Sequence, residues 1–515
     1  MKDQSNSIFR RDFLKGLVAI PFLGYFALKF KKSIDWEAEA RRMDYMSLLG
    51  IDSLEAPKQK LPVYNNQDRI RIGLIGHGWR GEQLLQSFGF IHPDMVRENT
   101  VNGKYTDWLK SFLSQGDLFV DFTGVCDTFE VHAQRGYETS TNDIRPGGGQ
   151  GKTKPAKIFP TYREMIESPD IDAVVICTPD HWHATMAIAA AKAGKHVFLE
   201  KPMTHSIEGA IDLRNTIKST GVVFQLGHEN RQQMSFKIAR ELYQKDVLGT
   251  VSMVQTYTNR NGLYGAWIRK RKFDDLGNAN NINWKEFLGN TQWYEFDPKR
   301  YFNWHRFSEY GTGFTGNDFS HQYDCVNQVL DLGIPDSVVA TGGQFYYKNH
   351  GDMPDVLNAI FNYPKRGLNL TYDGTLKNGV YRENYIMGSN AAMQLDLGIR
   401  LYKDDYSERY KNIQIDSTEP LYIYNGGTDV DAISSATSRA YIRGGYGPTF
   451  IDGKVIDATY LHIKEWLDAI RNGTETSCNI DEGFEEAVTF NMANLSYVNK
   501  KQILWDPATE KVIMV

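Results

Sequence analysis

From about residue 69 to residue 228, short hydrophobic runs alternate with stretches of helical periodicity. Five of these runs predict strands, at 70–76, 118–127, 172–179, 195–202 and 221–228. Between the third and fourth runs, the Ala-rich segment 183–194 predicts a helix that Gly194 closes. Continuous hydrophobic strands separated by helices are typical of a parallel sheet covered on both faces. The pattern therefore predicts a doubly wound α/β domain.

The pattern changes after residue 228. Longer strands are expected there, with few helices between them, at 252–258, 337–347, 356–363 and 391–398. Two helical patterns, 459–473 and 482–501, close the chain, and we expect them to pack back on the first domain. The second half is therefore predicted to be an α/β domain with a large, mainly antiparallel open sheet.

Charge and cysteine content narrow the functions that the chain can have. A net charge of −5 over 515 residues gives no electrostatic reason to bind nucleic acid, so no nucleic-acid partner is expected. The cysteines form no C-x-x-C pair, which argues against a disulfide framework or a zinc site. They are Cys126, Cys177, Cys325 and Cys478.

The N-terminus carries a pattern of its own. Residues 10–15 (RRDFLK) match the twin-arginine export pattern R-R-x-F-L-K, and the hydrophobic run 16–28 that follows is too short to span a bilayer. We expect the twin-arginine machinery to export the protein to the periplasm. No small-x-small cleavage site follows the run directly, so an uncleaved N-terminal anchor stays open as well. The alternative interpretation is an N-terminal helix with a chance arginine pair.

The hexapeptide GHGWRG (76–81) has the spacing G-x-G-x-x-G, after the first predicted strand and before a helical stretch. In that context Gly76 allows a tight turn, Gly78 lets the backbone approach a pyrophosphate, and Gly81 lets helix and strand pack closely. The pattern predicts a dinucleotide-binding turn. The candidate cofactor residues in it are Gly76, Gly78, Trp79, Arg80 and Gly81.

Asp127 ends the second predicted strand, where such domains place a ribose-binding carboxylate. It lies farther from the hexapeptide than usual, which an insertion at 90–117 would explain. A carboxylate there repels a 2′-phosphate, so NAD is favoured over NADP as the cofactor. The alternative is an aspartate that caps a helix, and one residue can do both.

Further motifs occur in their expected strand contexts: TPDHWH (178–183), EKP (200–202), WKEFLGN (284–290) and GTGFTGNDFSHQYD (311–324). Together they resemble the Gfo/Idh/MocA oxidoreductases, the glucose–fructose oxidoreductase and inositol dehydrogenase family, over roughly residues 69–500. The resemblance implies a Rossmann domain, a C-terminal α/β domain with an open sheet, and an active site between them. It also implies NAD(P)-dependent oxidation of a CH–OH group, and a homo-oligomer that pairs through the C-terminal sheet.

The resemblance assigns roles to particular residues. It implies that Lys201 contacts cofactor and substrate, and that His321 removes the hydroxyl proton, which suits a side chain with a pKa near working pH. Asn317 stands where the family has an aspartate, and we expect it to orient a substrate hydroxyl. Further residues implied to lie beside the cofactor are Thr178, Pro179, His181, His183 and Glu200. His181 and His183 form a His-x-His pair, but no third ligand is evident, so no metal is expected.

Residues that could line the substrate cleft are His228, Arg231, Trp304, Arg306, Asp318 and Asp324. Arginines and aromatic residues are also ordinary material for a domain interface. Asp324 lies one turn after His321 on the predicted helix, and could orient that histidine or simply solvate the helix.

These observations define four segments: a signal at 1–32, an arm or linker at 33–67, an NAD-binding Rossmann domain at 68–227, and a substrate and oligomerisation domain at 228–515. We expect an NAD-dependent oxidoreductase acting on a hydroxyl of a sugar or glycoside. Two alternatives stay open. One is NAD-dependent glycoside cleavage through transient C3 oxidation and elimination. The other is a ligand-binding relative without turnover. An exported enzyme of this kind is expected to hold NAD tightly.

Overall fold

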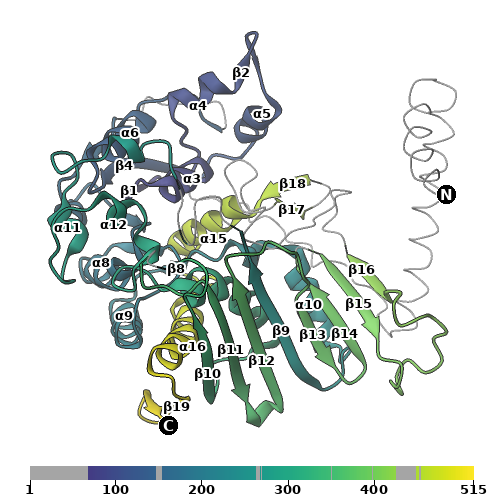
Figure 1. Ribbon diagram of the computed structural model, residues 1–515. Coiled ribbons are helices and arrows are strands. Elements are labelled where there is room, and N and C mark those ends of the chain that lie inside the picture. Colours follow the sequence, from purple (N-terminus) through teal and green to yellow (C-terminus); the bar gives the residue numbers. More distant parts are fainter. Residues whose placement is uncertain are drawn as a thin grey trace, which may run out of the picture.

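The computed structural model describes residues 68–515 except 147–153, 262–266, 268–269, 349–350, 397, 425–447 and 452–453. The predicted signal segment and arm lie outside the described residues. Figure 1 shows a first domain built on a parallel sheet, and a second built on a large sheet whose strands run side by side. The predicted fold class is confirmed.

The first sheet is parallel, with six strands in the order β5-β4-β1-β6-β7-β8. They are β1 (Ile70–Ile75), β4 (Val120–Cys126), β5 (Lys157–Ile158), β6 (Ala173–Ile176), β7 (His196–Leu199) and β8 (Phe224–Leu226). All five predicted strands are present, and only the two-residue β5 was missed. The order reverses between β1 and β6, so the chain makes its topological switch there, where ligands bind in sheets of this kind.

Helices cover this sheet on both faces. They are α3 (Trp79–Ser87), α6 (Glu130–Ser140), α7 (Tyr162–Glu167), α8 (Asp180–Lys192) and α9 (Ile207–Thr220). The predicted insertion between β1 and β4 folds into α4 (Pro93–Glu98), α5 (Asp107–Leu113) and a small hairpin of β2 (Thr100–Val101) and β3 (Lys104–Tyr105). This insertion explains why Asp127 lies so far along the chain from the Gly-rich turn.

The second sheet has ten strands in the order β16-β15-β14-β13-β9-β12-β11-β10-β19-β20. They are β9 (Val251–Asn259), β10 (Ser337–Gly343), β11 (Val356–Tyr363), β12 (Leu368–Thr375), β13 (Tyr385–Gly388), β14 (Ala391–Leu395), β15 (Ile399–Lys403), β16 (Tyr422–Tyr424), β19 (Ile503–Asp506) and β20 (Lys511–Met514). Among these strands β9 and β12 pair in parallel and the other neighbours are antiparallel. The predicted, mainly antiparallel sheet is thus confirmed.

The sequence pattern missed β12 because Asp373 and Gly374 look like turn residues. A Cβ on Gly374 would lie 2.7 Å from the ring of Phe314, so the glycine lets this strand pack closely against the helical segment above it. Asp373 is ion-paired with Arg382 on the more exposed face of the sheet.

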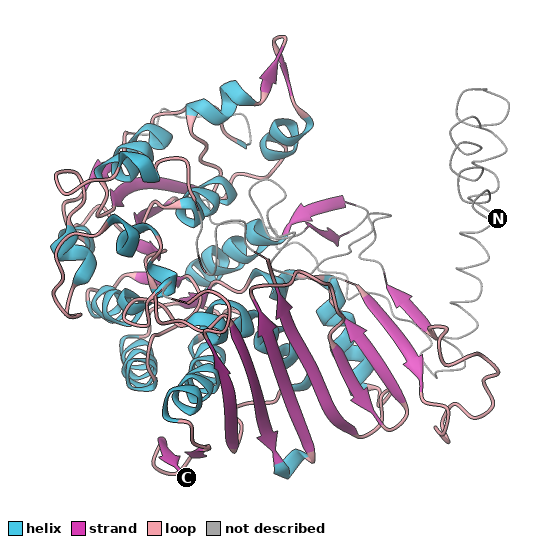
Figure 2. Ribbon diagram, viewed as in Figure 1, coloured by secondary structure: helices cyan, strands magenta, loops and turns pink. Residues whose placement is uncertain are grey.

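The two closing helices reach both domains. Trp466 of α15 (Ala458–Asn472) packs against Phe198 of β7, with ring centroids 5.7 Å apart. The second helix, α16 (Ile480–Asn499), contacts α9, β8 and β10, and in Figure 1 it lies between α9 and β10, while α10 (Met234–Gln244) lies behind the C-terminal sheet (Figures 1 and 2). These contacts join the end of the chain to the Rossmann domain.

The remaining elements are short, apart from α13. They are η2 (Glu229–Gln232), η3 (Asp274–Leu276), α11 (Trp284–Leu288), α12 (Pro298–Phe302), η4 (Trp304–Arg306), η5 (Thr315–Phe319), α13 (Ser320–Leu330), η6 (Pro364–Arg366), β17 (Pro448–Ile451) and β18 (Lys454–Asp457). The segment around α11, α12 and η4 holds a separate aromatic cluster that includes Phe129 of the first domain, Phe287 and Tyr310.

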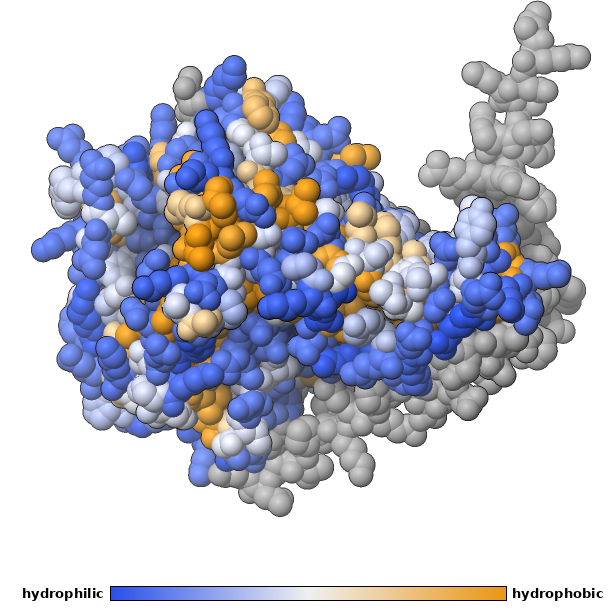
Figure 3. Space-filling view, turned by 90° about the horizontal axis from the view of Figure 1, so that it is seen from below, coloured by the Kyte–Doolittle hydropathy of each residue, from blue (hydrophilic) through white to orange (hydrophobic). Residues whose placement is uncertain are grey.

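No helix among the described residues has the length and hydrophobicity needed to cross a membrane. Seen from below the view of Figure 1, the surface is mainly hydrophilic, and its hydrophobic residues lie in separate patches (Figure 3).

Candidate active site

One cavity opens at the topological switch of the first sheet and extends to the second domain. It is lined by the Gly-rich turn after β1, by Asp127 after β4, by Thr178 and Pro179 after β6, and by Lys201 after β7. The second domain contributes Trp304 and the cluster Asn317, Asp318 and His321. Because carboxyl ends of parallel strands meet at one edge, residues from four separate loops converge there.

The three glycines of the turn have distinct environments. Gly76 has a φ of +91°, and a Cβ on it would lie 2.4 Å from the carbonyl oxygen of Cys177. A Cβ on Gly81 would lie 2.2 Å from the carbonyl oxygen of Gly76, so this glycine permits close contact between helix and strand. A Cβ on Gly78 would meet no described atom within 4 Å. Gly78 lines the cavity, so the backbone there is open to a ligand.

Asp127 combines the two roles considered from the sequence. Its Oδ2 accepts a hydrogen bond of 2.7 Å from the backbone N–H of His77, and its Oδ1 accepts one of 2.8 Å from that of Phe129. Burial opposes the charged form, but hydrogen bonds from His132 and from these amides outweigh it and lower the pKa of Asp127. The carboxylate is therefore ionised, shapes the Gly-rich turn and borders the cavity.

Arg80 ties the first helix of the domain to the end of β7. Its Nε lies 2.7 Å from Glu200 Oε1, and its NH2 lies 3.2 Å from Glu229 Oε2. Burial raises the pKa of Glu229 to about 7, although the Arg80 charge opposes the shift. Glu200 Oε2 also accepts a hydrogen bond from the backbone N–H of Lys201, so this ion pair holds the catalytic-site candidate Lys201 in place.

Lys201 points across the cavity to the second domain. Its Nζ donates a 2.9 Å hydrogen bond to the backbone carbonyl of Asn317. Asn317 belongs to η5, a π-helical segment that runs directly into α13. Such segments widen a helix by one residue and occur often at functional sites.

The π-helical segment brings the side chains of Asn317 and Asp318 to the cavity, and the first turn of α13 brings that of His321. The Nδ2 of Asn317 is buried and has no hydrogen-bond partner among the described residues. Asp318 forms an ion pair with Arg260. The site therefore does hold a carboxylate near the family's aspartate position, one residue later along the chain and already paired with an arginine.

The environment of His321 favours its neutral form. Burial lowers the pKa of His321 well below its ordinary value, and the charges of Lys201 and His228 lower it further. The ring of His321 lines the cavity, so a neutral imidazole is available there as a proton acceptor.

Three predicted cofactor residues do not line this cavity: Gly81, which serves the packing of helix against strand, and two histidines. His183 is buried in α8 and bonds the backbone carbonyls of Pro202 and Thr178, at 2.7 and 2.9 Å. The Nε2 of His181 lies 2.9 Å from the carbonyl of Phe287, and burial lowers the pKa of His181 to about 4. Both ring nitrogens of His183 and the Nε2 of His181 are bonded to backbone carbonyls, so these histidines help to hold the TPDHWH loop and α11 in place.

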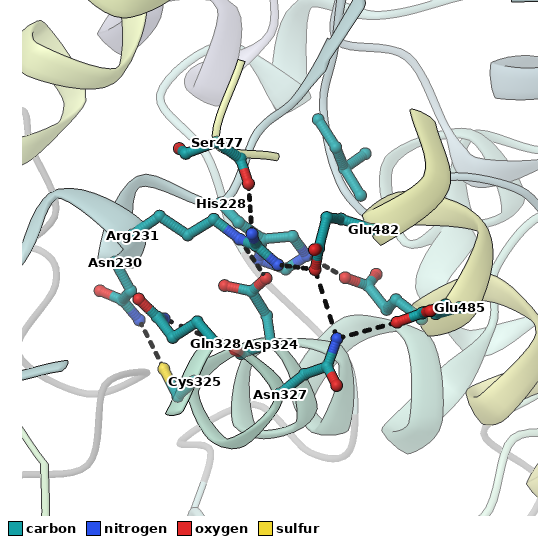
Figure 4. A network of polar contacts seen from close by, with 12 residues as sticks. His228, Asn230, Arg231, Asp324, Cys325, Asn327, Gln328, Ser477, Glu482 and Glu485 are labelled. Carbon is teal, nitrogen blue, oxygen red and sulfur yellow. Dashed lines mark hydrogen bonds and ion pairs between the residues drawn. The ribbon is translucent and has the colours of Figure 1, made fainter. Parts of the chain in front are cut away.

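Three predicted substrate residues also lie elsewhere. His228, Arg231 and Asp324 belong to a buried ion-pair network (Figure 4) and do not line the cavity. Arg306 does not line the cavity either, whereas its neighbours Trp304 and His305 do. The rings of these two stack with centroids 3.6 Å apart and an interplanar angle of 20°.

The sequence reading missed several lining residues, among them Tyr162, Arg271, Tyr301 and His305. They come from loops and short helices whose position depends on tertiary packing. In the NWHRF segment the sequence indicated Trp304 and Arg306, whereas the residues that line the cavity are Trp304 and His305.

Comparisons with known proteins agree with this geometry. Residues 113–228 match the family model described as "Oxidoreductase family, NAD-binding Rossmann fold", GFO_IDH_MocA. A 2,7-anhydro-N-acetylneuraminate hydratase of Escherichia coli (strain K12) is 26% identical over 237 residues, which are 45% of this chain and 54% of the relative. A glycosyl hydrolase family 109 protein of Shewanella sp. (strain ANA-3) is 31% identical over 206 residues, 39% of this chain and 34% of the relative. The chain thus spans about half, or less, of these relatives.

Among solved structures, the WlbA dehydrogenase from Bordetella pertussis in complex with NADH and UDP-GlcNAcA superposes with a TM-score of 0.54. It is 16% identical, over 86% of this chain and 99% of that one. At that identity the likeness establishes the fold.

The fold and the Gly-rich turn define a two-domain dinucleotide-binding protein. More particularly, the chain has the NAD-binding fold of the Gfo/Idh/MocA oxidoreductases, with sugar-related homologues. The prediction of NAD as the cofactor is confirmed by this match, while the preference over NADP stays a prediction.

Proposed function

We propose that the protein is an NAD-dependent oxidoreductase that acts on a hydroxyl of a sugar or glycoside. The observation that carries this proposal is the convergence of Lys201 and His321 in one cavity with the Gly-rich turn. The sugar-related names of the relatives support the substrate class.

The residues present fit a dinucleotide. Gly78 leaves its backbone open to the cavity, the negative charge of Asp127 suits ribose hydroxyls, and the buried Oγ1 of Thr178 has no hydrogen-bond partner among the described residues. The N-terminus of α3 begins at Trp79 and favours phosphate groups. When bound, NAD supplies the two-electron acceptor for oxidation of an alcohol carbon.

Residues of the chain itself would accept the proton of the substrate hydroxyl and stabilise the charge that develops. Neutral His321 accepts the proton of the substrate hydroxyl as the alcohol becomes a carbonyl. Lys201 places a positive charge beside the oxygen on which negative charge develops, and the carbonyl of Asn317 fixes its direction. The stacked rings of Trp304 and His305 offer a flat aromatic surface for a sugar ring.

A second reaction is favoured by the relatives' names, which describe hydrolysis and hydration without net oxidation. In such a cycle, transient oxidation at C3 of the sugar acidifies the C2 proton and permits elimination of the C1 substituent. Water then adds and the carbonyl is reduced again. The same proton acceptor and the same lysine serve both reactions.

A panel of sugars and glycosides separates these possibilities. Accumulation of free NADH with one substrate supports net oxidation, and cleavage of a glycoside without net NADH supports the transient route. If the purified protein binds NAD but neither oxidises nor cleaves any member of the panel, while a ligand still binds, the catalytic proposal fails.

We also propose that the chain is exported by the twin-arginine route and retains its NAD. The support is the sequence RRDFLK at 10–15 together with the Gly-rich turn at 76–81. That route carries folded proteins, so a cofactor bound in the cytoplasm can travel inside its domain. Free NAD is scarce outside the cytoplasm, and a tightly held cofactor would be regenerated in place.

Pairing of two copies through the C-terminal sheet is a further part of the proposal. A cross-strand row on the outer face of the sheet includes Val339, Ile360 and Thr371. Val339 and Ile360 are 47% and 50% exposed, which is unusual for adjacent β-branched residues in the middle of a sheet. Sedimentation of wild-type protein and of Ile360→Lys tests this: the variant should dissociate, and an unchanged mass would contradict it.

A further inference from the structure

His228 lies directly behind the candidate base. Its ring centroid is 5.3 Å from that of His321, and the two rings are nearly perpendicular, at 87°. The side chain follows β8, is fully buried, and contacts the carboxylate of Glu486 on α16 through Nε2. His228 therefore sits between His321 and a buried carboxylate, without bordering the cavity itself.

A buried network holds this arrangement in place (Figure 4). Asp324 lies one turn after His321 on α13 and accepts a 2.7 Å hydrogen bond from Arg231 Nε. Arg231 NH2 reaches Glu482 of α16 at 2.8 Å, and its NH1 donates to the carbonyl of Ser477. The loop after β8, α13 and α16 are thus tied together, so His228 has little freedom to turn away.

The charges around the two histidines differ in sign. Burial alone lowers the pKa of His228, but the carboxylates of Glu486 and Asp324 outweigh it and raise that pKa. Burial lowers the pKa of His321, and the cations that it faces from several elements lower it further. The charged groups around the pair are Lys201 after β7, Arg80 of α3, Arg260 after β9, Arg231 after β8, Asp324 of α13 and Glu486 of α16.

The same cluster has the composition of a metal site, since ligand atoms of His228, Asp324 and Glu486 lie within 4.8 Å of one another. The guanidinium of Arg231 already supplies positive charge there, at 2.7 Å from Asp324 Oδ1. A divalent cation would be repelled by it at close range. We therefore interpret the cluster as an ion-pair network.

We propose that His228 is a positioning residue for His321: its imidazolium, paired with Glu486, packs against the His321 ring and keeps that ring neutral and ready to accept a proton. The role of His321 as a base rests on the proposed function, but the protonation states of His228 and His321 can be tested without it. The arrangement divides the work between two histidines. His228 stays positively charged, and His321 stays neutral until it accepts the proton of the substrate hydroxyl.

The wild-type protein tests the protonation states directly. Full-length protein labelled in its 12 histidines is titrated by NMR, with His321 and His228 assigned by the signals lost in His321→Gln and His228→Gln. At pH 6 we expect a neutral His321 ring and a doubly protonated His228 ring. A charged His321 or a neutral His228 at that pH would overturn the proposal, whether or not a substrate is known.

Variants test the coupling. In His228→Gln the titration of His321 should move to higher pH by about one unit or more, because a neighbouring positive charge is lost. Glu486→Gln should abolish the charged state of His228. The matched control is Glu485→Gln on the adjacent position of α16, whose carboxylate bonds Asn327 instead and should leave both titrations unchanged.

Once a substrate is known, the acid limb of kcat/KM should move up by the same amount in His228→Gln, with NAD affinity unchanged. An unshifted His321 titration in a folded, NAD-binding variant refutes the positioning role. A shifted titration without any turnover in the wild type leaves the positioning role intact and counts against the proposed reaction instead.

Discussion

The ammonium of Lys201 and the backbone carbonyl of Asn317 are joined by a 2.9 Å hydrogen bond across the domain boundary. Lys201 follows a strand of the NAD-binding sheet, and Asn317 belongs to the π-helical segment that leads to His321. The bond therefore fixes the position of Lys201 relative to His321. Because the acceptor is a backbone carbonyl, most substitutions of Asn317 would preserve this bond.

Removing the side chain of either Lys201 or His321 should strongly reduce turnover. Lys201→Ala and His321→Ala are each expected to lower kcat by about 10²-fold or more, the scale of general acid–base groups. NAD binding and thermal stability should change little. Lys192→Ala, at an exposed position of α8, is the control. Steady-state kinetics that find near wild-type kcat in both active-site variants would refute the assignment.

Two of the three glycines of the turn should respond differently to the same added methyl group. Gly81→Ala drives a Cβ to within 2.2 Å of the Gly76 carbonyl, so it should cost about 1–3 kcal/mol of stability and disturb NAD binding. Gly78→Ala meets no described atom within 4 Å and should fold normally while weakening NAD binding alone. Thermal melts and NAD titrations measure both effects. Equal stability losses would contradict the packing assigned to Gly81.

Asp127 should select NAD over NADP. Asp127→Ala is expected to weaken NAD binding and to relax discrimination against the 2′-phosphate, because a buried, ionised carboxylate is removed from the end of β4. The loss of its bonds to the His77 and Phe129 amides should also lower the stability of the turn. Asp170→Ala, 81% exposed in its side chain, is the control. An unchanged NAD/NADP affinity ratio would remove Asp127 from the cofactor site.

The protein should lose stability in mild acid. Burial lowers the pKa of His77 from 6.5 to about 4, so below pH 6.5 the unfolded chain binds more protons at this residue than the folded one. Stability is therefore full above pH 6.5 and falls as the pH drops towards 4, by at most about 3 kcal/mol for His77.

His77→Leu removes this proton linkage, and its backbone N–H can still bond Asp127. Chemical denaturation between pH 7 and pH 4 should show a shallower loss of stability in the variant. His181 and His462, with pKa values lowered by burial to about 4 and about 3, keep some of the slope. Parallel curves for variant and wild type would contradict the prediction, because they would show that the pKa of His77 is the same in the folded and the unfolded chain.

The export proposal predicts a protein that leaves the cytoplasm with its cofactor. Replacing Arg10 and Arg11 by lysine should leave the protein in the cytoplasm, as fractionation of cells expressing both forms would reveal. Wild-type protein purified without nucleotide and dialysed extensively should still contain NAD by mass spectrometry. Empty protein that binds NAD reversibly with micromolar affinity would contradict cofactor retention.

The features that sequence reasoning could place are those that depend on the local backbone. Gly76, Gly78 and Gly81 could be assigned from spacing because a turn between a strand and a helix dictates their environments. Thr178 and Lys201 could be placed because they follow strands directly. Asn317 and Asp318 both face the cavity because a π-helical segment rotates them, and hydrophobic periodicity gives no sign of such a segment.

The predicted site residues that lie away from the cavity share a physical feature. They carry polar groups typical of a binding site, but in the folded chain these groups form hydrogen bonds or ion pairs with other buried groups. The residues are His183, His228, Arg231 and Asp324. Which polar residue faces a ligand and which satisfies another buried group depends on contacts between distant elements. His228 and Arg231 pair with residues of α13 and α16 that lie far along the sequence.

The place of β9 in its sheet also sets an order of assembly. This strand is synthesised before both of its neighbours, β12 and β13, which follow it by more than a hundred residues of chain. Until β12 has emerged from the ribosome, β9 has two open edges that can pair with another chain, and one edge stays open until β13 follows. A nascent or truncated chain ending before β12 is therefore the form of this protein most exposed to aggregation, and the one with the greatest need of a chaperone.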